Sequence, residues 1–189
     1  SKLTDIAVRL EYKRKTAFEA EQNGRYAEAV SVLLPAVKPH LPYLDIPGHD
    51  AIDLAMRTGC TLFHGGMQLF EAGLDDERPE RAERFLRAAR NLFQVCSEAK
   101  WWDRAEDAQY RVLLCTVMLG EREEAARTLE TAVGPPTDVR GYGAFWLAKG
   151  FYAYAAENYD AAADAAAQSL LFEHKDLSVF PYALLLSGA

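Results

Sequence analysis

Apolar side chains recur at steps of three and four residues along most of this chain, the spacing that places them on one face of an α-helix. The clearest stripe runs from residue 52 to residue 70 and consists of Ile52, Met56, Cys60, Phe63, Met67 and Phe70. A second stripe lies between residues 82 and 96 and consists of Ala82, Phe85, Leu86, Ala89, Leu92, Phe93 and Cys96. The pattern therefore predicts an all-α protein.

Turn-forming residues divide this helical pattern into pairs of helices. Asn23-Gly24 and Gly120 each supply a glycine where a helix is expected to end. Residues 39–49 contain three prolines and one glycine, so we expect an ordered connecting loop there and no helix. The expected antiparallel helix pairs cover residues 4–38, 50–98, 103–133 and 141–174, and an apolar segment, 177–189, caps the last pair. A chain of 189 residues is expected to form a single domain, 1–189.

Small residues stand where two neighbouring helices would have to approach closely. Within residues 153–171, two helices are expected to turn at Glu157-Asn158-Tyr159 and to pack along Ala153, Ala162, Ala166 and Ser169. The same order of turn, bulky residue or proline, and small residue recurs at 23–29, 77–82 and 120–125, which places alanines beside the turns: Ala29, Ala82 and Ala125. We expect the alanines beside the turns to be buried.

The last of these units resembles the tetratricopeptide repeat, with Trp146, Gly150, Tyr159 and Ala162 in register. The intervals between the alanines, 29 to 82, 82 to 125 and 125 to 162, shrink toward the roughly 34-residue period of that family. The resemblance implies antiparallel helix pairs that stack as a short right-handed superhelix. It also implies an inner groove that binds a protein or peptide, although folds of this kind serve many functions.

A second resemblance concerns residues 159–175 and the apolar segment around Pro181. These are similar to the C-terminal part of some bacterial polymorphic-toxin immunity proteins, which are acidic, all-helical and cytoplasmic and neutralise a toxin by binding it directly. The alternative function is therefore toxin immunity, with an acidic surface that includes Asp45, Asp50 and Asp53 and covers a basic toxin. A third hypothesis makes the chain the ligand-sensing half of a transcriptional regulator whose DNA-binding part lies upstream of Ser1.

Charge and composition narrow the class of partner. The formal net charge of −7 argues against direct binding of nucleic acid and suits a cytoplasmic protein or one with a basic partner. The chain has no apolar run near the roughly 20 residues of a membrane span, so no membrane partner is expected. Cys60, Cys96 and Cys115 are odd in number and widely spaced, which predicts three buried thiols in a reducing compartment.

Aromatic residues are densest between residues 142 and 159, and they supply the first candidate binding residues. Tyr142, Tyr152 and Tyr154 fall off the alanine-lined face, so with Trp146 they are candidates to anchor a peptide or helix. Packing into the core is the alternative for this group. The apolar segment 177–189 must also be covered, either by the chain itself or by a second copy in an oligomer.

Charged residues supply the other candidates. Arg84 and Arg87 belong to a ribbon of arginines at three-residue steps, which would clamp an anion or would form a solvated face paired to Glu80 and Glu83. Asp45, Asp50 and Asp53 lie in and just after the proline-rich loop, which is a partner contact or a spacer between repeats.

Sequence motifs typical of catalytic or metal-binding sites are weak throughout the chain. Cys60 and His64 lie one helical turn apart without a third metal ligand nearby, which favours a core thiol beside a histidine over a metal site. The chain contains no GxxxxGK[ST], GxGxxG, HExxH or GxSxG pattern. The sequence thus predicts a non-enzymatic module that binds a protein or peptide, with no catalytic residues, no metal and no cofactor.

Overall fold

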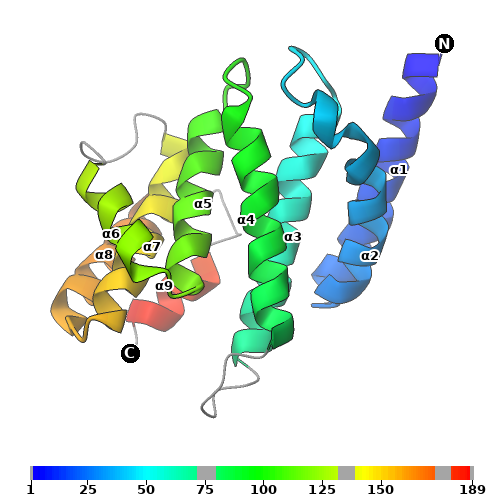
Figure 1. Cartoon of the computed structure of the whole chain (residues 1–189). Helices are drawn as coiled ribbons and strands as arrows, with labels where there is room; N and C mark the ends of the chain where they lie inside the picture. Colours follow the sequence, from blue (N-terminus) through cyan, green and yellow to red (C-terminus); the bar gives the residue numbers. More distant parts are fainter. Residues whose placement is uncertain (1, 72–79, 132–138, 173–179, 188–189) are drawn as a thin grey trace. The chain divides into compact units, whose positions relative to one another are not determined.

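The computed structural model describes residues 2–71, 80–131, 139–172 and 180–187 (Figure 1). Every regular element in these ranges is a helix, so the all-α prediction is confirmed for the described residues. The chain divides into two compact units, Ser1–Trp102 (unit 1) and Asp103–Ala189 (unit 2). The ends of two predicted helix pairs, near residues 133 and 174, lie outside the described residues, as does the turn 77–79.

Unit 1 consists of two antiparallel helix pairs joined by a 3₁₀ segment. Its elements are α1 (Lys2–Gln22), α2 (Tyr26–Val37), η1 (Lys38–Tyr43), α3 (Ala51–Glu71) and α4 (Glu80–Glu98). Successive helices pack side by side, with the closest association between α3 and α4 (Figure 1). The turn between α1 and α2 depends on Gly24, whose φ of +67° lies in the left-handed region that glycine adopts without strain.

The proline-rich segment differs from its prediction. It is ordered, because Leu44 is fully buried and its carbonyl oxygen accepts a hydrogen bond from Trp101 Nε1 at 3.2 Å. However, it begins as the 3₁₀ helix η1, where no helix was predicted. Pro39 occupies the first turn of η1, where the missing N–H removes no intrahelical hydrogen bond. The prolines therefore end α2 without preventing a further helical turn.

Glycines allow α3 to approach α4 closely. A Cβ atom built on Gly59 would lie 2.6 Å from the Phe93 ring, and one built on Gly65 would lie 2.7 Å from the Phe85 ring. Phe93 is among the largest fully buried side chains of the unit. The aromatic rings of α4 thus occupy the space that side chains on α3 would fill, which explains why glycine occurs inside a buried helix despite its low helix propensity.

Unit 2 is built around α7. Its elements are α5 (Ala105–Met118), α6 (Arg122–Thr131), α7 (Val139–Ala155), α8 (Tyr159–Phe172) and α9 (Phe180–Ser187). Helix α7 packs extensively against α5 and α8, and α9 covers α8 and part of α7. Helix α6 makes only sparse contact with α7, and Ala125 is its one buried residue among those described. This weak packing of α6 leaves space beside α7.

The hairpin of α7 and α8 matches its prediction. Helix α7 ends at Ala155 and α8 begins at Tyr159, so the bend falls at the predicted residues, and Glu157 adopts a φ of +59° there. Asn158 Oδ1 accepts a hydrogen bond from the Ala161 N–H at 3.3 Å, which satisfies one free N–H at the start of α8. Ala162, Ala166 and Ser169 are buried as expected, whereas Ala153 is half-buried.

The C-terminal helix α9 caps unit 2. Tyr182, Ala183 and Leu186 are buried, and a Cβ atom on Gly150 would lie 2.6 Å from Leu186 Cδ2. Leu184 and Leu185 remain exposed on the same helix. The described part of the predicted capping segment therefore covers α7 and α8, while 177–179 and 188–189 lie outside the described residues. None of the described helices combines the length and apolar content needed to cross a lipid bilayer.

Candidate functional site

A groove lies between α6 and α7 in unit 2 and ends at the turn that leads into α8. Its volume is about 580 Å³. The lining residues are mostly apolar or aromatic and are Ala126, Leu129, Glu130, Phe145, Trp146, Lys149, Tyr152, Ala153, Ala156 and Asn158. All of them belong to unit 2, so the groove is a feature of one compact unit.

The groove follows from the side chains on its two walls. On α6, Ala126, Leu129 and Glu130 are three and four residues apart and therefore share one face. On α7, the lining residues from Phe145 to Ala153 recur at the same helical steps, and Ala156 and Asn158 follow in the turn after α7. Ala126 on one wall and Ala153 on the other are too small to fill the space between the helices, which remains open.

Phe145 and Trp146 form the aromatic part of the α7 wall. The Phe145 ring is buried and makes edge contacts with Tyr110 and Trp146, each at a centroid distance of 5.3 Å. These contacts hold the two rings in place and preorganise the wall. Trp146 itself is half-buried, and its Nε1 atom is buried without a hydrogen-bond partner among the described residues.

A cation lies on the aromatic wall. The ammonium nitrogen of Lys149 is 4.8 Å from the centroid of the Trp146 ring, within the range of a cation–π interaction. Lys149 is exposed, so its long side chain can leave the ring at little cost. Glu130 on the opposite wall is the acidic residue among the lining side chains, and it has no ion-pair partner within the described part of the chain.

Two of the four predicted aromatic anchors meet in the groove. Trp146 and Tyr152 line it, one and a half to two turns apart on α7. Tyr142 is half-buried and lies outside the lining. Tyr154 is 44% exposed and packs edge-on against Tyr159 at 5.5 Å, away from the groove.

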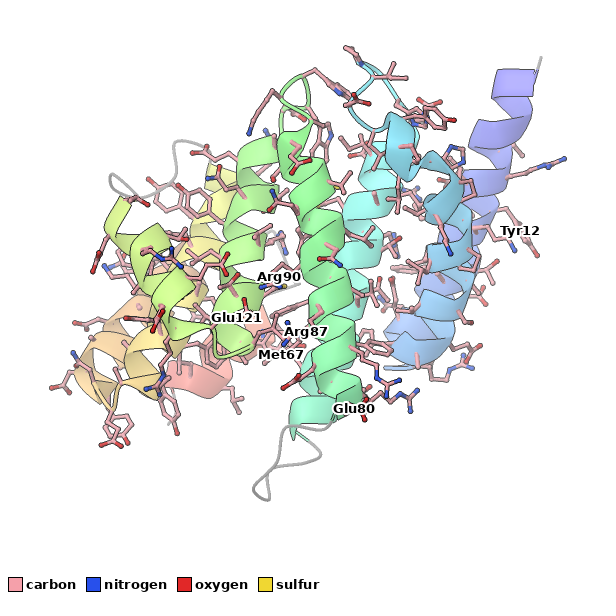
Figure 2. All side chains as sticks on the ribbon, in the orientation of Figure 1. Tyr12, Met67, Glu80, Arg87, Arg90 and Glu121 are labelled. Atoms are coloured by element: carbon pink, nitrogen blue, oxygen red, sulfur yellow. The ribbon has the colours of Figure 1, made fainter. Side chains whose placement is uncertain are left out.

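The predicted arginines lie on α4 of unit 1 and are paired within their own helix. Arg84 forms an ion pair with Glu80 at 2.5 Å, and Arg87 Nη2 is 3.8 Å from a Glu83 oxygen. Figure 2 labels Glu80 and Arg87 along α4. This geometry agrees with the alternative interpretation of the ribbon, a solvated face with pairs four residues apart.

Two of the three predicted aspartates, Asp45 and Asp50, are exposed in the loop that leads into α3, and the third, Asp53, is exposed in the first turn of α3. Two histidines order this loop: His49 Nδ1 accepts a hydrogen bond from the Ala51 N–H at 3.2 Å, and its ring lies 5.4 Å from that of His40. Partial burial, followed by the charge of His49, lowers the pKa of His40 below its ordinary value. Unit 1 thus presents an exposed acidic loop beside His40, a histidine with a lowered pKa.

The three cysteines lie within the described residues. All three are free thiols; Cys96 and Cys115 are buried as predicted, but Cys60 is only half-buried. The His64 ring stacks on Tyr26 at 5.4 Å. No three His, Cys, Asp or Glu side chains gather into a metal-binding group among the residues that the structure describes.

Sequence reasoning missed Glu130, Lys149 and Asn158 as lining residues. For Lys149 a signal was present, because it lies three residues from both Trp146 and Tyr152 and must share their helical face. Glu130 and Asn158 carried no such signal, since they come from other elements and meet α7 only through tertiary packing.

The chain matches no protein-family model, no curated protein and no solved structure in comparisons with known proteins.

Proposed function

We propose that this chain is a non-enzymatic, tetratricopeptide-like helical-repeat module that binds a protein or peptide segment in the groove between α6 and α7. The observation that carries the proposal is the groove itself, which has a volume of about 580 Å³ and an aromatic wall. A volume in this range accommodates a few side chains of a bound segment. Trp146 and Tyr152 are the anchors, because aromatic side chains bury large areas at a small cost in conformational entropy.

The repeat interpretation is part of this proposal. It is supported by the burial of the alanines beside the turns, since Ala29, Ala82, Ala125 and Ala162 are all buried. It is also supported by the α7–α8 hairpin, whose bend and small positions follow the repeat pattern. In the proposed arrangement the helix pairs stack as a short right-handed superhelix. A crystal structure in which successive pairs rotate with the opposite hand would reject this part of the proposal.

The groove is tested with single substitutions on α7. The probe is a display library of random linear peptides selected on the full chain, and the selected peptides are then measured by fluorescence anisotropy. Because buried aromatic anchors dominate binding energy, Tyr152→Ala and Trp146→Ala are expected to weaken binding by about tenfold or more.

Tyr154→Ala is the matched control, because Tyr154 is the same residue type on the same helix but lies outside the lining. It is expected to leave the affinity unchanged. Circular dichroism must show equal helical content in all variants. Equal affinity of wild type, Trp146→Ala and Tyr152→Ala would reject the groove as the binding site.

A further inference from the structure

We infer that the groove takes a cationic segment of a protein partner and that an Arg or Lys side chain of this segment lies against the Trp146 ring. The inference rests on the proposed function, because it names the chemistry of the segment that the groove would bind. It is carried by three independent features of unit 2: its net charge, the cation on Trp146, and the acidic side chains without partners at the groove.

The net charge of the chain is concentrated in the unit that bears the groove. Residues 103–189 contain thirteen acidic and seven basic side chains, a net charge of −6, whereas residues 1–102 contain fifteen and fourteen, a net charge of −1. A surface with this excess of negative charge attracts cationic segments and repels anionic ones.

The Trp146 ring already carries a cation. Lys149 Nζ lies 4.8 Å from its centroid, which shows that this face of the indole is accessible to a positive group. A guanidinium group stacks on an indole more favourably than an ammonium group does. An arginine of the partner can therefore replace Lys149, whose exposed side chain moves into solvent.

One acidic side chain lies on a wall of the groove and a second lies at its end. Glu130 lines it, and Glu157 precedes Asn158 at the turn that closes it. Both are exposed, and neither has an ion-pair partner within 4.0 Å among the described residues. A cationic segment would supply the partners that the chain itself does not.

Lys149 also permits the opposite hypothesis, in which it binds an acidic segment. That segment would enter the same groove as Glu130, in the unit with a net charge of −6. The two hypotheses predict opposite signs for the same substitutions, so one experiment separates them.

The probe is again a display library of random linear peptides selected on the wild-type chain. We expect the selected peptides to carry a net positive charge and to bind less tightly as salt is added. Glu130→Gln is expected to weaken their binding by about two- to fivefold, the range of an exposed ion pair. Lys149→Gln is expected to strengthen it by a similar factor, because it removes the competing cation from Trp146.

Two variants serve as matched controls, and both leave the charge at the groove unchanged. Glu123→Gln and Arg127→Gln alter exposed charges on α6 that do not line the groove, and each is expected to have a smaller effect than its counterpart in the groove. All four substitutions change exposed side chains and leave the aromatic rings in place, so the helical content should stay equal.

The outcomes separate the two proposals. Selected peptides that are acidic or neutral but depend on Trp146 and Tyr152 would overturn the cationic partner and leave the proposed function standing. Weaker binding after Lys149→Gln together with stronger binding after Glu130→Gln would also overturn the cationic partner and leave the proposed function standing. Cationic peptides that ignore Trp146 would overturn the inferred position of the cation, and a library that yields no peptide dependent on Trp146 or Tyr152 would overturn the proposed function as well.

Discussion

Ser169 donates a hydrogen bond from its Oγ to the main-chain carbonyl oxygen of Gly143, across the α7–α8 pair, at 3.1 Å. Ser169 is fully buried, and Gly143 is buried opposite it. Because the serine side chain is short, this hydrogen bond brings the backbone of α8 close to that of α7. The hydrogen bond therefore links α7, which forms one wall of the groove, to α8.

Replacing Ser169 separates the contribution of the hydrogen bond from that of close packing. Ser169→Ala keeps the small volume and removes the hydrogen-bond donor, so we expect the free energy of unfolding to fall by about 1 kcal/mol. Ser169→Leu adds volume to a closely packed contact and should cost about 1 to 3 kcal/mol more. Urea denaturation followed by circular dichroism measures both. A smaller loss for leucine than for alanine would contradict the close approach.

Gly59 tests whether packing or helix propensity decides the stability of α3. Alanine at this position would favour an isolated helix by about 1 kcal/mol. However, its Cβ atom would lie 2.6 Å from the Phe93 ring, which cannot move without disturbing the core. Overpacking of this kind costs about 1 to 3 kcal/mol, so we expect Gly59→Ala to lower the free energy of unfolding.

The control for this prediction replaces the Phe93 ring by the smaller side chain of leucine. In a Phe93→Leu background the clash is relieved, and the further change Gly59→Ala is expected to cost less than it does in wild type. Equal costs in both backgrounds would show that Phe93 is not the cause.

The helices and their close contacts could be predicted because they depend on local spacing. Small residues beside a turn identify where two backbones meet, and Ala29, Ala125 and Ala162 are indeed buried. The turn at Gly24 could be placed for a similar reason, since only a few residue types adopt a positive φ readily.

The groove could be predicted only in part. Trp146 and Tyr152 were identified from their own helix, but the opening depends on how sparsely α6 packs on α7, which no local pattern encodes. The helix η1 differs from its prediction for another reason. Three prolines and one glycine in residues 39–49 predict a loop, but Pro39 lies in the first turn of η1, where a helix tolerates proline. Tertiary packing also decides the burial of Cys60, which is half-buried although its helical stripe predicts burial.

The stability of unit 1 should depend on pH through His40. The pKa of His40 in the folded chain is lowered from 6.5, mainly by burial and then by His49, so the unfolded chain binds this proton more readily. Stability is therefore expected to fall as pH drops below 6.5.

The control for pH dependence is His40→Gln, which removes the titrating group and keeps a polar side chain. Urea midpoints of wild type and variant are compared across the range around 6.5. The difference between the two isolates His40 from the carboxylates that protonate at lower pH. Parallel curves would show that His40 does not couple to folding.

A buried ion pair on α5 should make the free energy of unfolding sensitive to the removal of a single charge. Asp107 is fully buried and accepts hydrogen bonds from Arg111 Nε and from Arg104 Nη2, each at 2.9 Å. Asp107→Asn leaves a buried guanidinium group without its anion, and we expect a loss of about 3 to 5 kcal/mol in the free energy of unfolding. Arg111→Met should cost less, because Arg104 still pairs with the carboxylate. The double variant Asp107→Leu/Arg111→Met should lose less free energy of unfolding than the summed losses of Asp107→Leu and Arg111→Met measured singly. The reason is that the double variant keeps neither of the two buried charges. A double-mutant cycle of urea denaturation measures this coupling, and additive losses would mean that the pair contributes no interaction of its own.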